Sequence, residues 1–258
     1  MSEPPARGRL VLVPTPLDFG IRGGRPLPDL QNVLSLAVIR QAAGLTYWVA
    51  ENAKSARAFL KRVDAIVPLA QRLQALRIVE LPRPAKGVKT PALPDLDELL
   101  APALQGHDIG LVSEAGLPAV ADPGAAVVQA AHRLGLGVLP LAGPSSLLLA
   151  LAASGLNGQS FAFVGYLPVD DGARAARIRE LEALSRRAGQ AQLMIETPYR
   201  NPALLAALLA HLQPATRLSV SCGLTLPEGW TRTDHIGAWR SRPTQVPADV
   251  PAVFALQA

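Results

Sequence analysis

The chain has few of the residues that support covalent or metal-based chemistry. Its 258 residues include one cysteine, Cys222, and four histidines at scattered positions. A single cysteine excludes an internal disulfide and a thiolate metal cluster, and the histidines lack metal-ligand spacing. We therefore expect no metal site, and we interpret Cys222 as a small buried apolar residue.

Sequence motifs of several common enzyme classes are also missing. The chain has no GxxxxGK[ST] phosphate loop, no GxGxxG after its first predicted strand and no GxSxG nucleophile elbow. These absences argue against P-loop, ordinary dinucleotide-binding and serine-hydrolase enzymes. No apolar run reaches the roughly 18 residues that span a bilayer, and the first residues lack a signal-peptide pattern. The sequence therefore predicts a soluble, cytoplasmic protein with no membrane partner.

Aromatic residues are scarce, at 4 %, whereas apolar residues together make up 49 % of the chain. The predicted core therefore consists mainly of Leu, Val and Ala, with Trp48 and Met194 in apolar strands. The net charge of +5 and the pI of about 9.9 fit a polyanionic partner such as RNA. A basic soluble protein without a nucleic-acid partner fits these values equally well.

Short apolar runs alternate with segments of helical periodicity along most of the chain. Such alternation is typical of a parallel sheet with crossover helices. We predict an α/β protein of two domains, residues 1–143 with a mostly parallel sheet and residues 144–258 with a mixed sheet. The first five strands are expected at 9–15, 46–50, 76–81, 108–112 and 137–141.

Two segments carry more detailed structural expectations. Asp29 precedes apolar residues at helical spacing and is expected to cap a helix that reaches Val38. The last segment, residues 229–258, is expected to form two antiparallel strands joined by a proline-rich loop.

The segment 113–124, SEAGLPAVADPG, is the strongest candidate for a functional loop, because it follows the apolar strand expected at 108–112. Its glycines let the backbone approach a ligand closely, and its prolines stiffen the loop. In α/β sheets, ligands bind beyond the carboxyl ends of the strands. The segment therefore predicts a binding site, with an ordinary strand-to-helix turn as the alternative.

Five motifs in a fixed order extend this interpretation. They are SEAGLPAVADPG at 113–124, PLAGPS at 140–145, SGL at 154–156, FVGYLP at 163–168 and ETPYR at 196–200. In this order they resemble the tetrapyrrole-methylase superfamily, the class III S-adenosylmethionine-dependent methyltransferases. Within it, the chain is most similar to the ribosomal RNA small-subunit methyltransferase I family, over roughly Arg9 to Ala258.

The resemblance implies a homodimer, with S-adenosylmethionine bound in a cleft between the two domains of each subunit. It also implies methylation of structured RNA, at a ribose 2′-hydroxyl of ribosomal RNA, and so a part in rRNA processing. The residues that the resemblance places at the cofactor are Pro16, Ser113, Ala115, Gly116, Val120, Ser145, Ser146, Glu196, Leu224 and Thr225.

Methyl transfer to a hydroxyl group needs the proton removed or the oxygen oriented. Glu114 is the candidate catalytic residue for that task, and Asp122 is the other carboxylate in the same loop. The position of Asp122 before Pro123 is also typical of a residue that caps the following helix.

Basic residues supply the candidate contacts with RNA. Lys86 and Lys89 lie in the long polar loop 82–94, and Arg200 ends the ETPYR motif. The basic helices expected around Lys54–Arg62 and Arg174–Arg187 fit either phosphate contacts or solvated faces. No aromatic residues interleave with these charges, so base stacking has no support in the sequence.

Departures from the family pattern leave two alternative functions open. The family's A-E-D-T-R-H-T stretch is AENAKSA at 50–56, and its R-E-L-T-K is SCGLT at 221–225. One alternative keeps the cofactor chemistry but methylates a small metabolite such as a tetrapyrrole. The other is a noncatalytic protein that binds S-adenosylmethionine or RNA.

Overall fold

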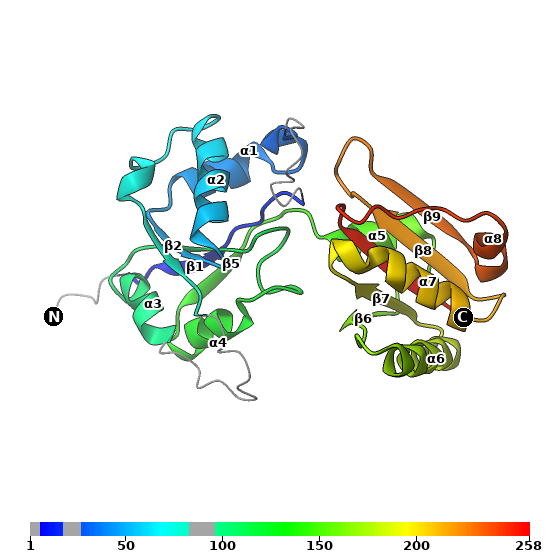
Figure 1. The fold of residues 1–258 in the computed structure, drawn as a ribbon. Helices are drawn as coiled ribbons and strands as arrows, with labels where there is room; N and C mark the ends of the chain where they lie inside the picture. Colours follow the sequence, from blue (N-terminus) through cyan, green and yellow to red (C-terminus); the bar gives the residue numbers. More distant parts are fainter. Residues whose placement is uncertain (1–5, 18–26, 83–95) are drawn as a thin grey trace. The chain divides into compact units, whose positions relative to one another are not determined.

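The computed structural model describes residues 6–17, 27–82 and 96–258. The chain divides into two compact units, unit 1 (Met1–Pro144) and unit 2 (Ser145–Ala258). Each unit has its own β-sheet, with helices packed on both faces of that sheet (Figure 1). The predicted fold class, α/β with a parallel first sheet and a mixed second sheet, is confirmed.

The sheet of unit 1 is parallel throughout, with the strand order β3-β2-β4-β1-β5. Its central strand β4 is buried at all four residues, as expected for a strand covered on both faces. Because the five strands run in the same direction, their carboxyl ends lie along one edge of the sheet. The strands are β1 (Arg9–Leu12), β2 (Tyr47–Ala50), β3 (Arg77–Glu80), β4 (Ile109–Val112) and β5 (Gly137–Pro140).

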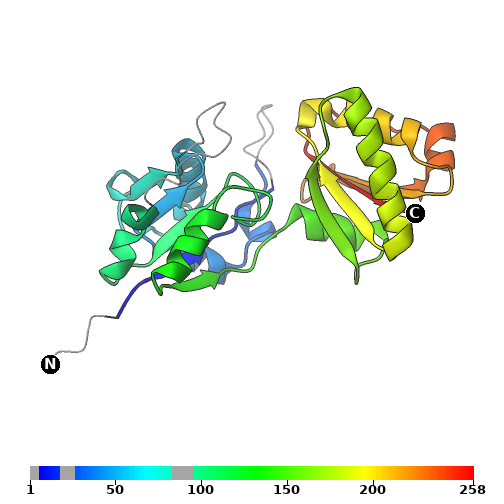
Figure 2. The ribbon, with the colours of Figure 1, turned by 90° about the horizontal axis from the view of Figure 1, so that it is seen from below.

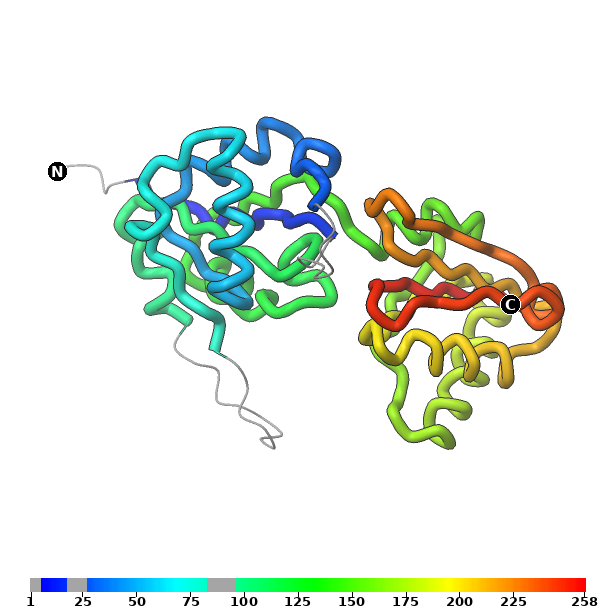
Figure 3. The backbone as a smooth tube through the Cα atoms, turned by 45° about the horizontal axis from the view of Figure 1, so that its top comes forward, coloured from blue at the N-terminus to red at the C-terminus, as the bar shows by residue number. Residues whose placement is uncertain are grey.

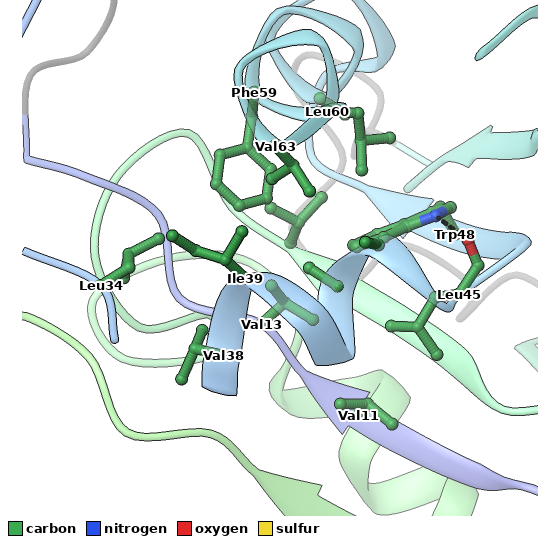
Figure 4. Packing of buried hydrophobic residues seen from close by; sticks show 14 of the residues in the cluster. Val11, Val13, Leu34, Val38, Ile39, Leu45, Trp48, Phe59, Leu60 and Val63 are labelled. Carbon is green, nitrogen blue, oxygen red and sulfur yellow. Dashed lines mark hydrogen bonds between the residues drawn. The ribbon is translucent and has the colours of Figure 1, made fainter. Parts of the chain in front are cut away.

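Two helices cover each face of this sheet. α1 (Leu36–Ala43) and α2 (Ala53–Asp64) pack on one face, and α3 (Leu96–Leu104) and α4 (Ala125–Arg133) pack on the other. Figure 4 shows the first of these interfaces, where Trp48 of β2 lies among apolar side chains from α1 and α2. Trp48 is 1 % exposed, which confirms its predicted place in the core.

The expected helix after Asp29 is divided into two elements, so this prediction was wrong in detail. Asp29 caps only a short 3₁₀ turn, η1 (Leu30–Asn32), by accepting a hydrogen bond from the Gln31 N–H. The helix α1 begins later, where the Ser35 hydroxyl accepts a hydrogen bond from the Val38 N–H. Apolar spacing runs through both elements, and the capping residues decide where each of them begins. A further 3₁₀ turn, η2 (Leu73–Ala75), precedes β3.

The sheet of unit 2 is mixed, with the order β6-β7-β10-β8-β9. β6 and β7 are parallel, whereas β10 pairs antiparallel with both β7 and β8 and is red in Figure 3. The strands are β6 (Phe161–Tyr166), β7 (Ala191–Ile195), β8 (Arg217–Cys222), β9 (Trp230–His235) and β10 (Ala252–Gln257).

The last segment, 229–258, does not form the expected pair of antiparallel strands. β8 lies between β9 and β10, and the short helix α8 (Ile236–Ser241) follows β9. Ile236 and Trp239 are both 0 % exposed and lie three residues apart, which buries one side of this helical turn. This local burial produces the helix that the alternation of apolar residues did not predict.

Helices cover both faces of the second sheet as well. α5 (Ser146–Ser154) packs on one face, and α6 (Asp171–Ala188), α7 (Asn201–His211) and α8 pack on the other. Figure 2 shows the long helix α6 lying along the sheet. Met194 and Cys222 lie in the core on the α6 side, at 0 % and 2 % exposure, as predicted. None of the helices in the described part of the chain is long and apolar enough to cross a membrane.

Candidate functional site

The candidate site of unit 1 lies at the carboxyl edge of its parallel sheet. Four loops leave the sheet there, after β1, β2, β4 and β5, and direct contacts join them to one another. The loop after β1 contains Thr15 and Pro16, and the loop after β4 is the segment 113–124.

Backbone hydrogen bonds join the loop after β1 to the loop after β4. Thr15 and Gly116 form an isolated antiparallel bridge. The Thr15 nitrogen lies 2.9 Å from the Gly116 carbonyl oxygen, and the Gly116 nitrogen lies 3.1 Å from the Thr15 carbonyl oxygen. The Thr15 hydroxyl also donates to the Ser113 carbonyl at 3.3 Å. Four predicted site residues therefore come together from two distant parts of the sequence, all of them buried: Pro16, Ser113, Ala115 and Gly116.

The loop after β5 reaches the same place through the close approach of Gly143 to the ring of Pro14. A Cβ atom at Gly143 would lie 2.2 Å from the Cβ and 2.4 Å from the Cγ of Pro14. Real Cβ atoms do not approach ring carbons so closely, so only glycine fits at this position. The adjacent Pro144 carbonyl lies 3.5 Å from the position of a Cβ at Gly116.

The segment 113–124 holds its shape with four residues in the left-handed region of backbone space. Gly116 and Gly124 have φ values of +78° and +133°, and the two alanines Ala119 and Ala121 have +66° and +63°. A non-glycine residue in this region costs about 1–2 kcal/mol. Strained residues of this kind collect at ligand-binding loops. Val120, between the two alanines, is 45 % exposed.

Asp122 does not cap the following helix, so that interpretation was wrong. The N-cap of α4 is Gly124, and no side chain makes a capping hydrogen bond there. The Asp122 carboxylate lies instead in a cluster with Glu51 and Glu114. Within this cluster the Glu114 N–H donates a hydrogen bond to the Glu51 Oε2 at 3.0 Å. Burial, reinforced by the negative charges of Glu51 and Glu114, raises the pKa of Asp122 to about 6. A hydrogen bond from Ser113 acts in the opposite direction and lowers the pKa, but by less.

Glu51 was not among the predicted site residues. It follows β2, which is β4's neighbour in the sheet, and its own N–H donates to the Val112 carbonyl at 3.1 Å. Its position directly after an apolar strand was visible in the sequence. The pairing of β2 with β4, which brings Glu51 to Glu114, depends on the strand order.

Asp122→Asn should stabilise the protein at neutral pH. The folded-state pKa of about 6 lies above the value of about 3.9 in an unfolded chain. The folded state therefore binds more protons between these values, and wild-type stability falls as the pH rises from about 4 to above 6. Allowing for solvent screening, we expect the variant to gain about 1–2 kcal/mol at pH 7.5 and nothing near pH 4.

Urea denaturation at these two pH values checks this expectation. Glu98→Gln, at an exposed position of α3, is the matched control and should change little at either pH. Equal stability of wild type and Asp122→Asn at pH 7.5 would contradict the raised pKa.

The predicted residues Glu196 and Arg200 pair with each other in unit 2. Glu196 follows β7 and is 9 % exposed. Its Oε2 lies 3.3 Å from the Arg200 Nη2, and its Oε1 accepts a hydrogen bond from the Thr197 N–H at 2.9 Å. The pair fixes the loop after β7, and both oxygens of the carboxylate have partners within it.

The other predicted residues of unit 2 lie at the start of α5 and after β8. Ser145 is the N-cap of α5, is 8 % exposed and makes no side-chain capping bond, and Ser146 is the first residue of the helix. Leu224 packs against the apolar cluster that α5 forms with β7 and β10. Thr225 has a φ of +69°, so this loop also holds a strained residue.

Lys86 and Lys89, the predicted contacts in the long loop, lie outside the described residues. Within the described ranges, no group of three or more His, Cys, Asp and Glu side chains is placed to hold a metal ion.

Sequence comparisons place the chain close to a group of RNA-modifying enzymes, although no protein-family model matches it. It is 36 % identical over 128 residues to the ribosomal RNA small subunit methyltransferase I of Mesorhizobium japonicum. This match covers 50 % of this chain and 42 % of the relative. It is 39 % identical over 118 residues to the protein of that name from Vibrio cholerae, covering 43 % and 40 %. The matches thus span less than half the length of these relatives.

Comparison of structures extends the likeness over nearly the whole chain. A uroporphyrin-III-C-methyltransferase from Thermus thermophilus matches 97 % of this chain and 92 % of its own, with a TM-score of 0.50 and 18 % identity. The methyltransferase CobJ matches 96 % and 93 %, with a TM-score of 0.55 and 17 % identity. At this level of identity the likeness establishes the fold.

Proposed function

We propose that the chain is a member of the tetrapyrrole-methylase superfamily and an S-adenosylmethionine-dependent methyltransferase whose acceptor is ribosomal RNA. The sequence similarity to ribosomal RNA small subunit methyltransferase I supports the choice of RNA. A ribose 2′-hydroxyl is the acceptor that the sequence resemblance favours. A homodimer and a cytoplasmic location remain predictions.

One structural observation carries this proposal. The loops after β1, β4 and β5 are fastened to one another by the Thr15–Gly116 bridge and by the approach of Gly143 to Pro14. Such a preformed, backbone-built surface at the carboxyl edge of a parallel sheet is where α/β proteins bind nucleotide-like ligands. We assign the cofactor to this surface, in contact with Pro16, Ser113, Ala115, Gly116 and Val120.

The residues present fit S-adenosylmethionine in charge and polarity. The cofactor carries a methyl group on a positively charged sulfonium, which activates it for transfer. The carboxylates of Glu51, Glu114 and Asp122 create a negative field that favours a cation. Val120, exposed on the same loop, offers apolar contact to a ligand. In unit 2, the resemblance alone assigns Ser145, Ser146, Glu196, Leu224 and Thr225 to cofactor binding, and Arg200 pairs with Glu196 there.

Proton removal from the acceptor falls to the carboxylate cluster. A general base works best when its pKa lies near the operating pH. Asp122 meets this condition with a pKa of about 6. Glu114 is exposed on the same loop and remains the candidate that contacts the acceptor directly. Holding donor and acceptor in line contributes the larger share of catalysis, roughly 7–11 kcal/mol for well-oriented groups.

Calorimetry with S-adenosylmethionine and transfer of a tritiated methyl group test the proposal together. We expect saturable binding of the cofactor, and label in the RNA of small ribosomal subunits from a strain that lacks this protein. Absence of cofactor binding at millimolar concentration would exclude a methyltransferase. Cofactor binding without label in RNA would exclude the RNA acceptor.

A small-metabolite acceptor is the second candidate function, and the segment after β2 favours it. Here Asn52 replaces the family's aspartate, and its side chain caps α2 by accepting from the Lys54 and Ser55 N–H groups at 2.9 Å and 3.3 Å. Label in a tetrapyrrole or another added metabolite, and none in RNA, would establish this candidate.

A further inference from the structure

The exposed side of α2 carries three basic residues and one acidic residue, Asp64, which is the last residue of the helix. Lys54, Arg57 and Lys61 are three and four residues apart, so they lie on one face of the helix, and all three are exposed. We propose that this face, the α2 basic face, docks the phosphate backbone of the RNA substrate. The inference rests on the proposed function, since it assumes an RNA acceptor, and it adds the surface that holds it.

Core packing fixes which side of α2 faces outward. Phe59, Leu60 and Val63 are buried in the apolar cluster of unit 1, where Figure 4 shows Phe59 above Ile39 and Leu60 near Trp48. The helix cannot rotate without exposing these side chains. The three basic side chains therefore project from the opposite side as a fixed row.

The charges of this row are available to a ligand. Among the described residues, none of Lys54, Arg57 and Lys61 forms an ion pair, and the Arg57 guanidinium donates only to the Ala53 carbonyl at 3.4 Å. The one carboxylate of α2 belongs to Asp64, which accepts a hydrogen bond from the Leu69 N–H at 3.0 Å.

α6 shows what an ordinary solvated helix of this protein looks like. It carries more arginines than α2, but acidic residues are interspersed, and Arg174 pairs with Asp171 and Arg177 with Glu180. Mixed signs with pairs at helical spacing stabilise an exposed helix. Among the described residues, Lys54, Arg57 and Lys61 form no such pairs. The helix dipole favours Lys61 in the last turn, so the comparison with α6 bears on Lys54 and Arg57.

The helix dipole points to the same conclusion. Cations are unfavourable near a helix N-terminus, where the partial charge is positive, and acidic residues are normally placed there. α2 has no acidic residue of its own in its first turn, where Lys54 is the second residue, and the carboxylate at this end comes from Glu80 of β3, which accepts a hydrogen bond from the Ala53 N–H at 2.7 Å. A position that weakens the helix is explained when the charge serves an anionic partner.

The location of the row links it to the candidate site. α2 begins two residues after Glu51, whose carboxylate accepts a hydrogen bond from the Glu114 N–H in the loop after β4. From Lys54 to Lys61 the row extends for about 10 Å along the helix axis. A phosphate backbone bound along it would run from the site outward. The exposed face has no large apolar side chain to insert into a lipid surface, so RNA fits better than a membrane.

The test compares two variants that lose the same charge. Lys54→Gln/Arg57→Gln/Lys61→Gln removes the row. Arg179→Gln/Arg186→Gln/Arg187→Gln removes three exposed arginines of α6 that form no ion pair within the described part of the chain. Binding of a fluorescein-labelled RNA stem-loop is followed by anisotropy as a function of salt. When the salt concentration rises from about 50 to about 200 mM, both proteins lose affinity for the RNA. The factor by which the wild type loses affinity should be roughly 20 to 40 times the factor for the α2 variant. The α6 variant should retain at least most of the wild-type salt dependence.

Two other readouts separate this inference from the proposed function. Calorimetry with S-adenosylmethionine should give the same cofactor affinity for wild type and both variants, because none of the substituted residues lies in the fastened loops. An α2 variant with the salt dependence of wild type, or an equal loss in both variants, would overturn the docking surface. Failure of the wild type to bind cofactor would overturn the proposed function instead.

Discussion

Gly143→Ala should reduce the rate of methyl transfer by about a hundredfold, because a displacement of about 1 Å at a positioned group has that effect. The added methyl group would lie 2.2 Å from the Pro14 Cβ. The proline ring is rigid, so the loops after β1 and β5 must move apart. The bridge between Thr15 and Gly116 lies beside this contact, and its geometry would change with it.

Calorimetry with S-adenosylmethionine measures cofactor binding by the Gly143→Ala variant, and single-turnover experiments measure its rate of methyl transfer. Urea denaturation measures the loss in free energy of unfolding, which we expect to be about 2 kcal/mol from overpacking. Gly158→Ala is the matched control, because a Cβ there meets nothing within 4 Å. A variant that is destabilised but binds the cofactor as wild type does would show that the fastened loops are not the cofactor site.

Gly110→Ala should destabilise unit 1 by about 3 kcal/mol, at the upper end of the range for overpacked cores. Gly110 lies in the central strand β4, beside Trp48 of β2 in the parallel register. A Cβ at this position would lie 2.5 Å and 2.6 Å from the Cε3 and Cζ3 of the Trp48 ring. The ring has little room to move, since it is 1 % exposed and its N–H donates to the Leu45 carbonyl at 3.2 Å.

A double-mutant cycle with Trp48→Leu isolates this contact. Shortening the side chain opens space, so Gly110→Ala should cost less in the Trp48→Leu background, with a coupling of about 2 kcal/mol. Gly44→Ala, where the new Cβ meets only carbonyl oxygens at 3.6 Å and 3.7 Å, is the control in the same unit. Equal costs of Gly110→Ala in both backgrounds would mean that the strain is relieved elsewhere in the sheet.

Much of the fold could be predicted from local pattern. β1, β2, β4 and α2 begin within about two residues of the positions expected from apolar runs and from capping residues. These features depend on neighbours in the sequence, so short windows contain the information. The helix α8 and the placement of β8 between β9 and β10 depend on burial against distant strands, and the alternation of apolar residues did not reveal them.

The candidate site divides in the same way. The segment 113–124 is recognisable from its glycines, prolines and carboxylates after an apolar strand, and the order of the five motifs carries the resemblance to the tetrapyrrole-methylase superfamily. The gathering of Glu51 with Glu114 and Asp122 follows from the pairing of β2 with β4, which the sequence pattern leaves open.

By itself, then, the sequence determined the element types, the α/β class and the loop most suited to a ligand, because each depends on residues close together in the chain. Only the tertiary structure decided the strand order, the contact of Gly143 with Pro14 and the raised pKa of Asp122. The physical reason is that burial and charge–charge interactions depend on distances in space, which separation along the sequence does not specify. The α2 basic face combines both kinds of information. Its spacing is local, whereas the absence of ion pairs to its three basic residues within the described ranges, and its start beside the site, come from the fold.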